Sequence, residues 1–221
     1  MQSASEGTST RALDHPPRAA SLGYLALKRL MDIVGASSAL LIAAPAMLLS
    51  AFAIKLDSRG PVFFWQYRLG ENGKPFRFYK FRSMSVDAPN MRDSLSSLNE
   101  TTGPVFKIRR DPRITRVGRW IRKFSIDELP QLFHVLAGTM SLVGPRPPIP
   151  AEVENYEPWQ RERLAVKPGL TCTWQVAGRS DIGFEDWVRL DIEYVRARNL
   201  WLDIKLLAMT IPAVITGRGA Y

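Results

Sequence analysis

The chain has 221 residues and a single cysteine, Cys172, so an internal disulfide is excluded and a reducing compartment fits best. No second hydrophobic core is evident, and we expect one folded domain. Thirty Lys and Arg against 21 Asp and Glu give a formal net charge of +9, which favours an anionic partner: a nucleic acid, an anionic lipid surface or a phosphorylated substrate.

The first part of the chain contains a polar tail and an apolar segment. Residues 1–21 are rich in Ser, Thr, Ala and Pro and have no apolar period, which predicts a disordered tail. From Ile33 to Ile54 no residue is charged, and this length matches a membrane segment. Three forms of that segment compete: a re-entrant helix, a single membrane span, and a signal peptide cleaved after Ala53.

The residues around the apolar segment favour the re-entrant form. Lys28 and Arg29 precede the segment and Lys55 follows it. Because basic residues prefer the cytoplasmic side, a single span would leave one basic flank on the wrong side. Pro45 removes a backbone hydrogen bond near the middle and bends a helix. We therefore predict a helix-break-helix over residues 22–57 that enters and leaves on the cytoplasmic face.

Two aromatic-rich stretches then predict a β-hairpin. Val62–Tyr67 and Phe76–Arg82 have strand propensity, and the Asn72-Gly73 pair between them tolerates the positive φ angles of a tight turn. Alternation in the second stretch puts Lys80 on the same face as two phenylalanines. Lys80 is thus a candidate for the protein interior, with a solvated lysine at the hairpin edge as the alternative.

The remaining segments are mainly helical in pattern. Residues 107–123 carry eight basic side chains, and apolar residues from Ile114 to Ile121 have helical spacing. This pattern predicts a basic amphipathic helix, either at an anionic membrane surface or with its apolar face in the core. Three further helices are predicted over Pro158–Leu164, Phe184–Arg198 and Leu200–Thr216. The fold class is therefore α+β and mostly helical, with a compact cytosolic domain over residues 58–221.

Two adjacent carboxylates, Asp127 and Glu128, lie at a predicted helix start. Ser125 and Glu128 fit a capping box, but Pro130 would then occupy the fifth helical position, where its ring clashes. A helix with Asp127 as its N-cap places Pro130 in the first turn instead. We predict this second arrangement, in which the helix dipole favours the ionised carboxylates.

These carboxylates would repel an anionic substrate unless a divalent cation lies between them, and Mg²⁺ is commonly held by one or two carboxylates and substrate phosphates. One carboxylate could then attack phosphorus while the other binds metal; helix capping and ion pairing with arginines is the alternative. Arg146 lies between prolines, so its backbone is pre-set, and it suits a phosphate unless it pairs with a surface acid. Arg179, after the strand-like Leu170–Val176, is a second such arginine.

Eight ordered motifs carry a family resemblance. They are Lys28-Arg-x-x-Asp32, Gly60-Pro-Val-Phe-Phe-x-Gln66, Lys80-Phe-Arg-Ser-Met84, Asp111-Pro-Arg-Ile-Thr115, Asp127-Glu-Leu-Pro-Gln131, Met140-Ser-Leu-Val-Gly-Pro-Arg-Pro147, Lys167-Pro-Gly-Leu-Thr171 and Trp174-Gln-Val-x-Gly-Arg179. Together they resemble the bacterial sugar transferases, the monotopic polyprenyl-phosphate phosphoglycosyl transferases, of the exopolysaccharide type.

The resemblance implies an enzyme of the inner, cytoplasmic membrane with its catalytic domain on the cytoplasmic face. Such an enzyme transfers a sugar 1-phosphate from a UDP-sugar to undecaprenyl phosphate and releases UMP, which initiates exopolysaccharide, capsule or O-antigen synthesis. Membrane lipid is then a partner and nucleic acid is not, while no pattern favours one oligomeric state. The alternative is a non-catalytic basic module that binds a membrane surface.

The resemblance also implies roles for single residues. Asp127 would be the nucleophile that forms a phosphosugar intermediate, and Glu128 would bind Mg²⁺. The implied substrate- and phosphate-binding residues are Lys80, Arg82, Arg146, Arg179 and Asp191. His134, where the family usually has Asn, is a departure that bears on the sugar preferred, for which glucose or galactose is expected, and not on the reaction.

Overall fold

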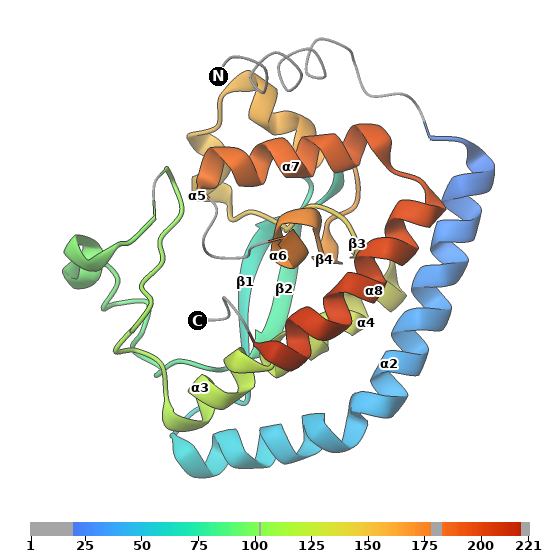
Figure 1. Cartoon of the computed structure of the whole chain (residues 1–221). Coiled ribbons are helices and arrows are strands. Elements are labelled where there is room, and N and C mark those ends of the chain that lie inside the picture. Colours follow the sequence, from blue (N-terminus) through green and yellow to red (C-terminus); the bar gives the residue numbers. More distant parts are fainter. Residues whose placement is uncertain (1–19, 102, 178–182, 218–221) are drawn as a thin grey trace, which may run out of the picture.

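The computed structural model describes residues 20–101, 103–177 and 183–217, so most of the predicted tail, residues 1–21, lies outside the described residues. The elements, in chain order, are α2 (Leu22–Asp57), β1 (Phe63–Leu69), η2 (Glu71–Gly73), β2 (Pro75–Phe81), η3 (Asp93–Leu98), α3 (Arg116–Lys123), η4 (Ile126–Gln131), α4 (Leu132–Ala137), β3 (Ser141–Val143), α5 (Pro150–Glu154), η5 (Pro158–Leu164), β4 (Gly169–Thr171), α6 (Thr173–Ala177), α7 (Phe184–Ala197) and α8 (Leu200–Thr216). Figure 1 shows α2 along one side and the lower edge of the body that the other elements form.

Helix α2 is continuous over 36 residues, with Pro45 inside it. Ser21 caps the helix, since its side chain accepts a hydrogen bond from the Tyr24 N–H. The helix bends sharply partway along its length (Figure 1), so the predicted break takes the form of a bend between two helical arms. Among the described residues α2 is the one helix long and apolar enough to cross a membrane.

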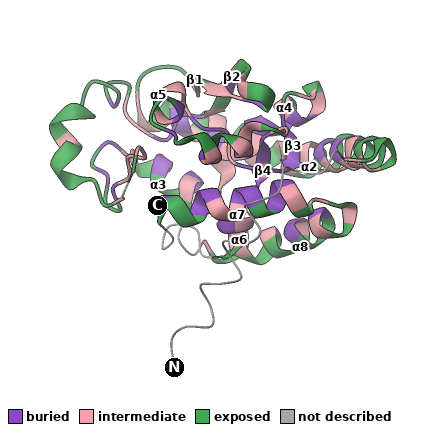
Figure 2. Cartoon of the chain, turned by 90° about the horizontal axis from the view of Figure 1, so that it is seen from above, coloured by how far each residue is buried: buried purple, intermediate pink, exposed green. Residues whose placement is uncertain are grey.

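Buried side chains gather where α2, β2, α4, β3, α7 and α8 meet. This central cluster includes Phe78, Leu132, Val135, Met140 and Leu142. A second cluster lies against α7 and contains the stacked Trp174 and Trp187, and a third joins the end of α2 to β2 and α3. Between its two ends, α2 exposes Leu41, Ile42, Leu48 and Leu49, and Figure 2 shows exposed residues along this helix.

The predicted hairpin is confirmed. Strands β1 and β2 pair antiparallel from Phe63 opposite Phe81 to Leu69 opposite Pro75. Asn72 and Gly73 in the connection have φ angles of 56° and 72°, as expected of residues that tolerate the left-handed region. Lys80 is half-buried on the same strand face as the buried Phe78, so the predicted alternation holds. A second, parallel pair joins β3 to β4.

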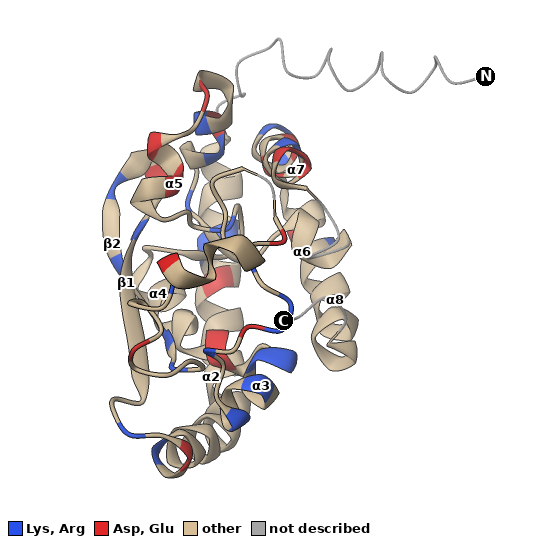
Figure 3. Cartoon of the chain, turned by 90° about the vertical axis from the view of Figure 1, so that its left-hand side faces the viewer, with Lys and Arg blue, Asp and Glu red and all other residues tan. Residues whose placement is uncertain are grey.

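Two helix and strand predictions are wrong in extent. The basic helix is shorter than the basic segment of residues 107–123: α3 covers Arg116–Lys123, capped by Thr115, and Asp111 and Arg113 form a buried ion pair in a turn before it. Likewise Leu170–Val176 is not one strand, since β4 ends at Thr171 and α6 follows. Figure 3 shows the Lys and Arg positions of α3, in blue, and α3 contacts α2.

Both ends of α2 are bonded to the same globular body. Near the N-terminal end, Arg29 donates to the carbonyl oxygens of Val135 and Leu136 at 2.6 and 2.7 Å, and Asp32 accepts from Ser141 and Leu142.

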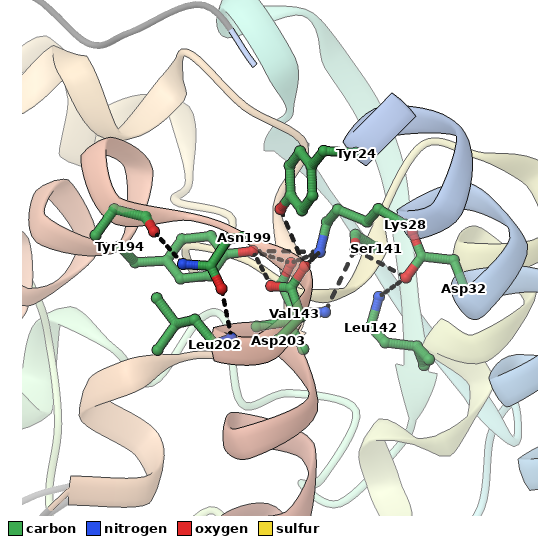
Figure 4. Close-up of polar contacts among 11 residues, drawn as sticks. Tyr24, Lys28, Asp32, Ser141, Leu142, Val143, Tyr194, Asn199, Leu202 and Asp203 are labelled. Carbon is green, nitrogen blue, oxygen red and sulfur yellow. Dashed lines mark hydrogen bonds and ion pairs between the residues drawn. The ribbon is translucent and has the colours of Figure 1, made fainter. Parts of the chain in front are cut away.

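Lys28 and Tyr24 bond to the buried Asp203 of α8 at 3.0 Å each (Figure 4). At the other end, Asp57 accepts from the Val117 N–H at 3.0 Å, and Lys55 donates to the Gly60 carbonyl. Lys28 and Arg29 are therefore structural attachments to the body, whereas Lys55 bonds only to the chain that leaves α2.

Candidate active site

The acidic pair lies in η4, a 3₁₀-helix that packs between β2, α3 and α2 and continues into α4. Ser125 precedes η4 in the left-handed region, with φ of 54°. The Glu128 N–H donates to the Ser125 carbonyl at 3.1 Å, so the helical turn begins before Asp127, and the prediction of Asp127 as N-cap is wrong.

The Ser125 side chain makes no capping hydrogen bond either, so the capping box is also absent at this turn. Pro130 is accommodated because the tighter 3₁₀ turn ends next to it and the α-helical bonds start only at Leu132.

The two carboxylates have different surroundings. Asp127 is 6% exposed, and burial, with the neighbouring Glu128 charge, raises its pKa to about 6, against the opposing charges of Lys80 and Arg122. Glu128 reaches solvent and its Oε1 lies 3.1 Å from Nη1 of Arg146. The pair therefore presents one buried carboxylate beside cations and one partly exposed carboxylate in an ion pair.

Cations converge on this pair from three elements. Lys80 comes from β2, and burial lowers its pKa to about 8 although Asp127 favours its charged form. Arg146 comes from the proline-rich segment after β3, and Glu128 raises its pKa in spite of burial. Arg122, on α3, is a third cation whose charge acts on Asp127; no motif of the sequence analysis marked it. Such an arrangement can bind several phosphate charges.

Other predicted site residues lie elsewhere. The Arg82 guanidinium donates to Ser58 and to the Pro61 carbonyl oxygen, so it holds the chain that leaves α2. Asp191 is completely buried in α7 and pairs with Arg163 at 2.5 Å; it reaches the site only through that arginine. Arg179 lies outside the described residues.

A magnesium ion fits the donor set of the site. Among the described residues no group of three or more His, Cys, Asp or Glu side chains gathers to hold a metal. Mg²⁺ needs no such group, since it is commonly held by one or two carboxylates while water and substrate phosphates complete its shell. Glu128, the carboxylate that reaches solvent, is the residue that could hold it.

The comparisons with known proteins agree with this chemistry. A family model described as bacterial sugar transferase matches residues 23–217. Galactosyl transferase CpsE of Streptococcus agalactiae serotype III is 48% identical over 198 residues. Undecaprenyl-phosphate galactose phosphotransferase of Salmonella typhimurium is 43% identical over 199 residues, and exopolysaccharide production protein ExoY of Rhizobium meliloti is 39% identical over 198 residues.

These relatives differ in how much of their length is matched. The CpsE alignment covers 89% of this chain and 44% of CpsE, and the Salmonella alignment covers 88% of this chain and 42% of the relative. The chain thus spans less than half the length of these two curated relatives. The ExoY alignment covers 88% of both chains.

Proposed function

Because the chain belongs to the bacterial sugar transferase family, we propose that it transfers a sugar 1-phosphate from a UDP-sugar to undecaprenyl phosphate and releases UMP. The observation that carries this proposal is a buried Asp127 beside a Glu128 that pairs with Arg146. Relatives named as undecaprenyl-phosphate galactose and glucose phosphotransferases support the lipid acceptor and these two sugars. The relatives named ExoY support a role in exopolysaccharide synthesis.

The reaction takes two displacements at one phosphorus atom. An Asp127 carboxylate oxygen attacks the phosphorus that bears the sugar, the bond to the bridging oxygen breaks, and UMP leaves. A phosphate oxygen of undecaprenyl phosphate then attacks the same phosphorus, which frees the Asp127 carboxylate and forms a diphosphate-linked sugar lipid.

Arg146 and Lys80 stabilise the negative charge that develops on the phosphate oxygens. Mg²⁺ held by Glu128 would supply further neutralisation of that charge.

The attachment of α2 supports a re-entrant membrane segment. Both ends of the helix are bonded to one globular body, whereas a single span would put them on opposite sides of the membrane. Between the ends, the apolar side chains of Leu41, Ile42, Leu48 and Leu49 are at least 70% exposed, as expected of groups that contact lipid. In this arrangement the catalytic domain rests on the cytoplasmic face of the inner membrane, where a lipid-borne acceptor arrives.

The test is release of UMP by the purified protein in detergent or nanodiscs. We expect continued release to require a UDP-sugar, undecaprenyl phosphate and Mg²⁺ together, with UDP-galactose and UDP-glucose as the donors tried first. Without the lipid, release should stop once each Asp127 carries a sugar phosphate. The alternative, a non-catalytic module that binds membranes through α3, predicts binding to anionic vesicles without any UMP release. No release from any UDP-sugar would therefore reject the proposed function.

A further inference from the structure

The segment that carries Arg146 is short of hydrogen-bond donors of its own. Pro145, Pro147 and Pro148 have no N–H group, so the rest of the protein can hold this part of the backbone mainly through its carbonyl oxygens. The outer carbonyls accept from backbone amides: Gly169 donates to Pro145, and Leu69 donates to Pro148, both at 2.9 Å.

The start of the segment is held from the membrane helix. The Val143 carbonyl lies 3.1 Å from Lys28 Nζ and 3.1 Å from the Tyr194 hydroxyl (Figure 4). Side chains of α2 and α7 thus converge on the residue three positions before Arg146. The backbone that carries Arg146, residues 143–148, is therefore hydrogen-bonded at both of its ends.

The two central carbonyls are held by guanidinium groups. Arg163 Nη2 donates to the carbonyl of Arg146 itself at 3.1 Å, and Arg68 Nη1 donates to the next carbonyl, that of Pro147, at 2.5 Å. One arginine comes from η5 and the other from β1. The two peptide units that follow Arg146 are therefore each held by a guanidinium group from a different element.

Arg163 is itself locked in place. Its Nη2 lies 2.5 Å from Asp191 Oδ2 and its Nη1 donates to the Tyr156 hydroxyl at 2.7 Å, with 5% and 1% of the two charged side chains exposed. Burial opposes the charge of Arg163, but Asp191 outweighs it and raises the Arg163 pKa. A buried ion pair contributes little more stability than apolar residues of similar volume, so stability alone does not account for this arrangement.

The position of Arg68 disfavours its positive charge. Its guanidinium lies 4.8 Å from the centre of the Phe78 ring, and burial, together with the positive charge of Arg146, lowers its pKa to about 10. Two like charges side by side repel each other until an anion binds between or beside them. This repulsion fits a site that is completed by a diphosphate.

We propose that Arg68 and Arg163, the latter held by Asp191, are positioning residues that fix the direction of Arg146 through the carbonyls of Arg146 and Pro147. They act on the transferred phosphate through Arg146. The proposal rests on the proposed function for its kinetic readout. In this proposal the role of Asp191 is to hold Arg163 in place.

The experiment is a double-mutant cycle with Arg163→Lys, Arg68→Lys and Arg146→Ala. Lysine keeps the charge but has no fork with which to bond several partners at once. Each single lysine variant should lower kcat/KM for the UDP-sugar roughly 10- to 100-fold, because small misplacements of a binding group are costly. In the Arg146→Ala background the same substitutions should have almost no further effect.

A matched control exists in the same two helices. Glu162→Gln removes the ion pair of Glu162 with Arg196, which also joins η5 to α7. We expect it to change kcat/KM by about twofold or less, as for an ordinary ion pair near the surface. Equal losses of kcat/KM in this control and in Arg163→Lys would mean that Arg163 contributes only to stability.

Additive losses in the Arg146→Ala background would overturn the proposal, since they would mean that Arg68 or Arg163 acts on substrate directly. If Arg146→Ala leaves no measurable turnover, the same cycle is run on the dissociation constant for UDP by calorimetry. A wild-type protein that binds UDP but releases no UMP would reject the proposed function, while the binding cycle would still decide the positioning role.

Discussion

Asp127 and Glu128 are adjacent in sequence, yet their surroundings separate their roles. Asp127 is buried and has no capping role, whereas Glu128 reaches solvent and pairs with Arg146. A nucleophile benefits from a dry site in which neighbouring cations act strongly. A magnesium ligand needs room for water and substrate phosphate around the metal. The division of labour proposed for the pair follows from these two environments.

Glu128→Gln tests the metal role at the level of one residue. Glutamine is nearly isosteric but lacks the negative charge, so the Mg²⁺ concentration for half-maximal UMP release should rise roughly tenfold or more, as metal sites respond to the loss of a supporting group. Glu154→Gln, at an exposed position in α5, is the control and should leave the titration unchanged. An unchanged Mg²⁺ titration in Glu128→Gln would exclude this ligand.

His134 predicts a dependence of stability on pH. Its Nε2 accepts the Tyr79 N–H at 3.2 Å and its ring stacks on Tyr79 at 5.5 Å, and burial lowers its pKa. A histidine whose pKa is lower in the folded state than in the unfolded state stabilises the protein at pH values above its unfolded-state pKa of about 6.5. That contribution is lost as the pH falls.

The midpoint temperature of thermal unfolding should therefore fall more between pH 7.5 and pH 5.5 in wild type than in His134→Asn. An Asn side-chain oxygen can accept the same N–H without titrating. Identical losses in the two proteins would show that His134 is not the titrating group.

Some of these residue environments follow from local sequence and others do not. The Asn72-Gly73 turn and the inward face of Lys80 are set by short-range rules, and both predictions are confirmed. Arg82 looks like a site residue because it follows Lys80 closely, but its partners are Ser58 and Pro61. These residues precede β1 and come near because the pairing of the hairpin strands places Arg82 opposite Val62.

At the scale of elements, the error at the acidic pair has a physical cause. Pro130 excludes a long α-helix from Ser125, as expected, but the chain resolves the conflict with a left-handed residue and a 3₁₀ turn. Periodicity does not distinguish a 3₁₀ turn from the start of an α-helix. The helices α7 and α8 have nearly the predicted bounds, and α8 accommodates Pro212 inside it.

Asp203→Asn tests how α8 holds α2. Asp203 is completely buried and accepts from Tyr24, Lys28 and Tyr194. Loss of its charge leaves Lys28 without its ionic partner, and we expect a decrease of about 3–5 kcal/mol in the free energy of unfolding. The measurement is denaturant unfolding, with the exposed Asp186→Asn as control. A decrease equal to that of the control would mean that the contact contributes little.

At the scale of the whole molecule, both ends of α2 are fixed to one globular body. Its N-terminal end bonds to α4, β3 and α8, and its C-terminal end bonds to α3. The charges on both flanks predict that the two ends of the apolar segment lie on the same side of a membrane, and the bonds of Arg29 and Asp57 to one body support this prediction. Lys28 links α2 to the backbone that carries Arg146, because its Nζ donates to the Val143 carbonyl.

Cysteine labelling tests this topology. The native Cys172 is buried, so Gly23→Cys and Arg59→Cys, at exposed positions near the two ends of α2, supply accessible thiols. Both should react with a membrane-impermeant maleimide in inside-out vesicles and neither in right-side-out vesicles, while Ile42→Cys in the apolar middle should react poorly in both. A reaction of one end in each vesicle type would establish a single span instead.

The central claim is that Asp127 forms a covalent bond to the transferred phosphorus. The most direct measurement incubates the protein with a UDP-sugar labelled in the sugar-bearing phosphate, without lipid acceptor, and maps the label by mass spectrometry. We expect one sugar phosphate on the peptide that contains Asp127, its discharge when undecaprenyl phosphate is added, and no label on Asp127→Asn. A protein that turns over without an adduct, or with the adduct on another residue, would contradict this account.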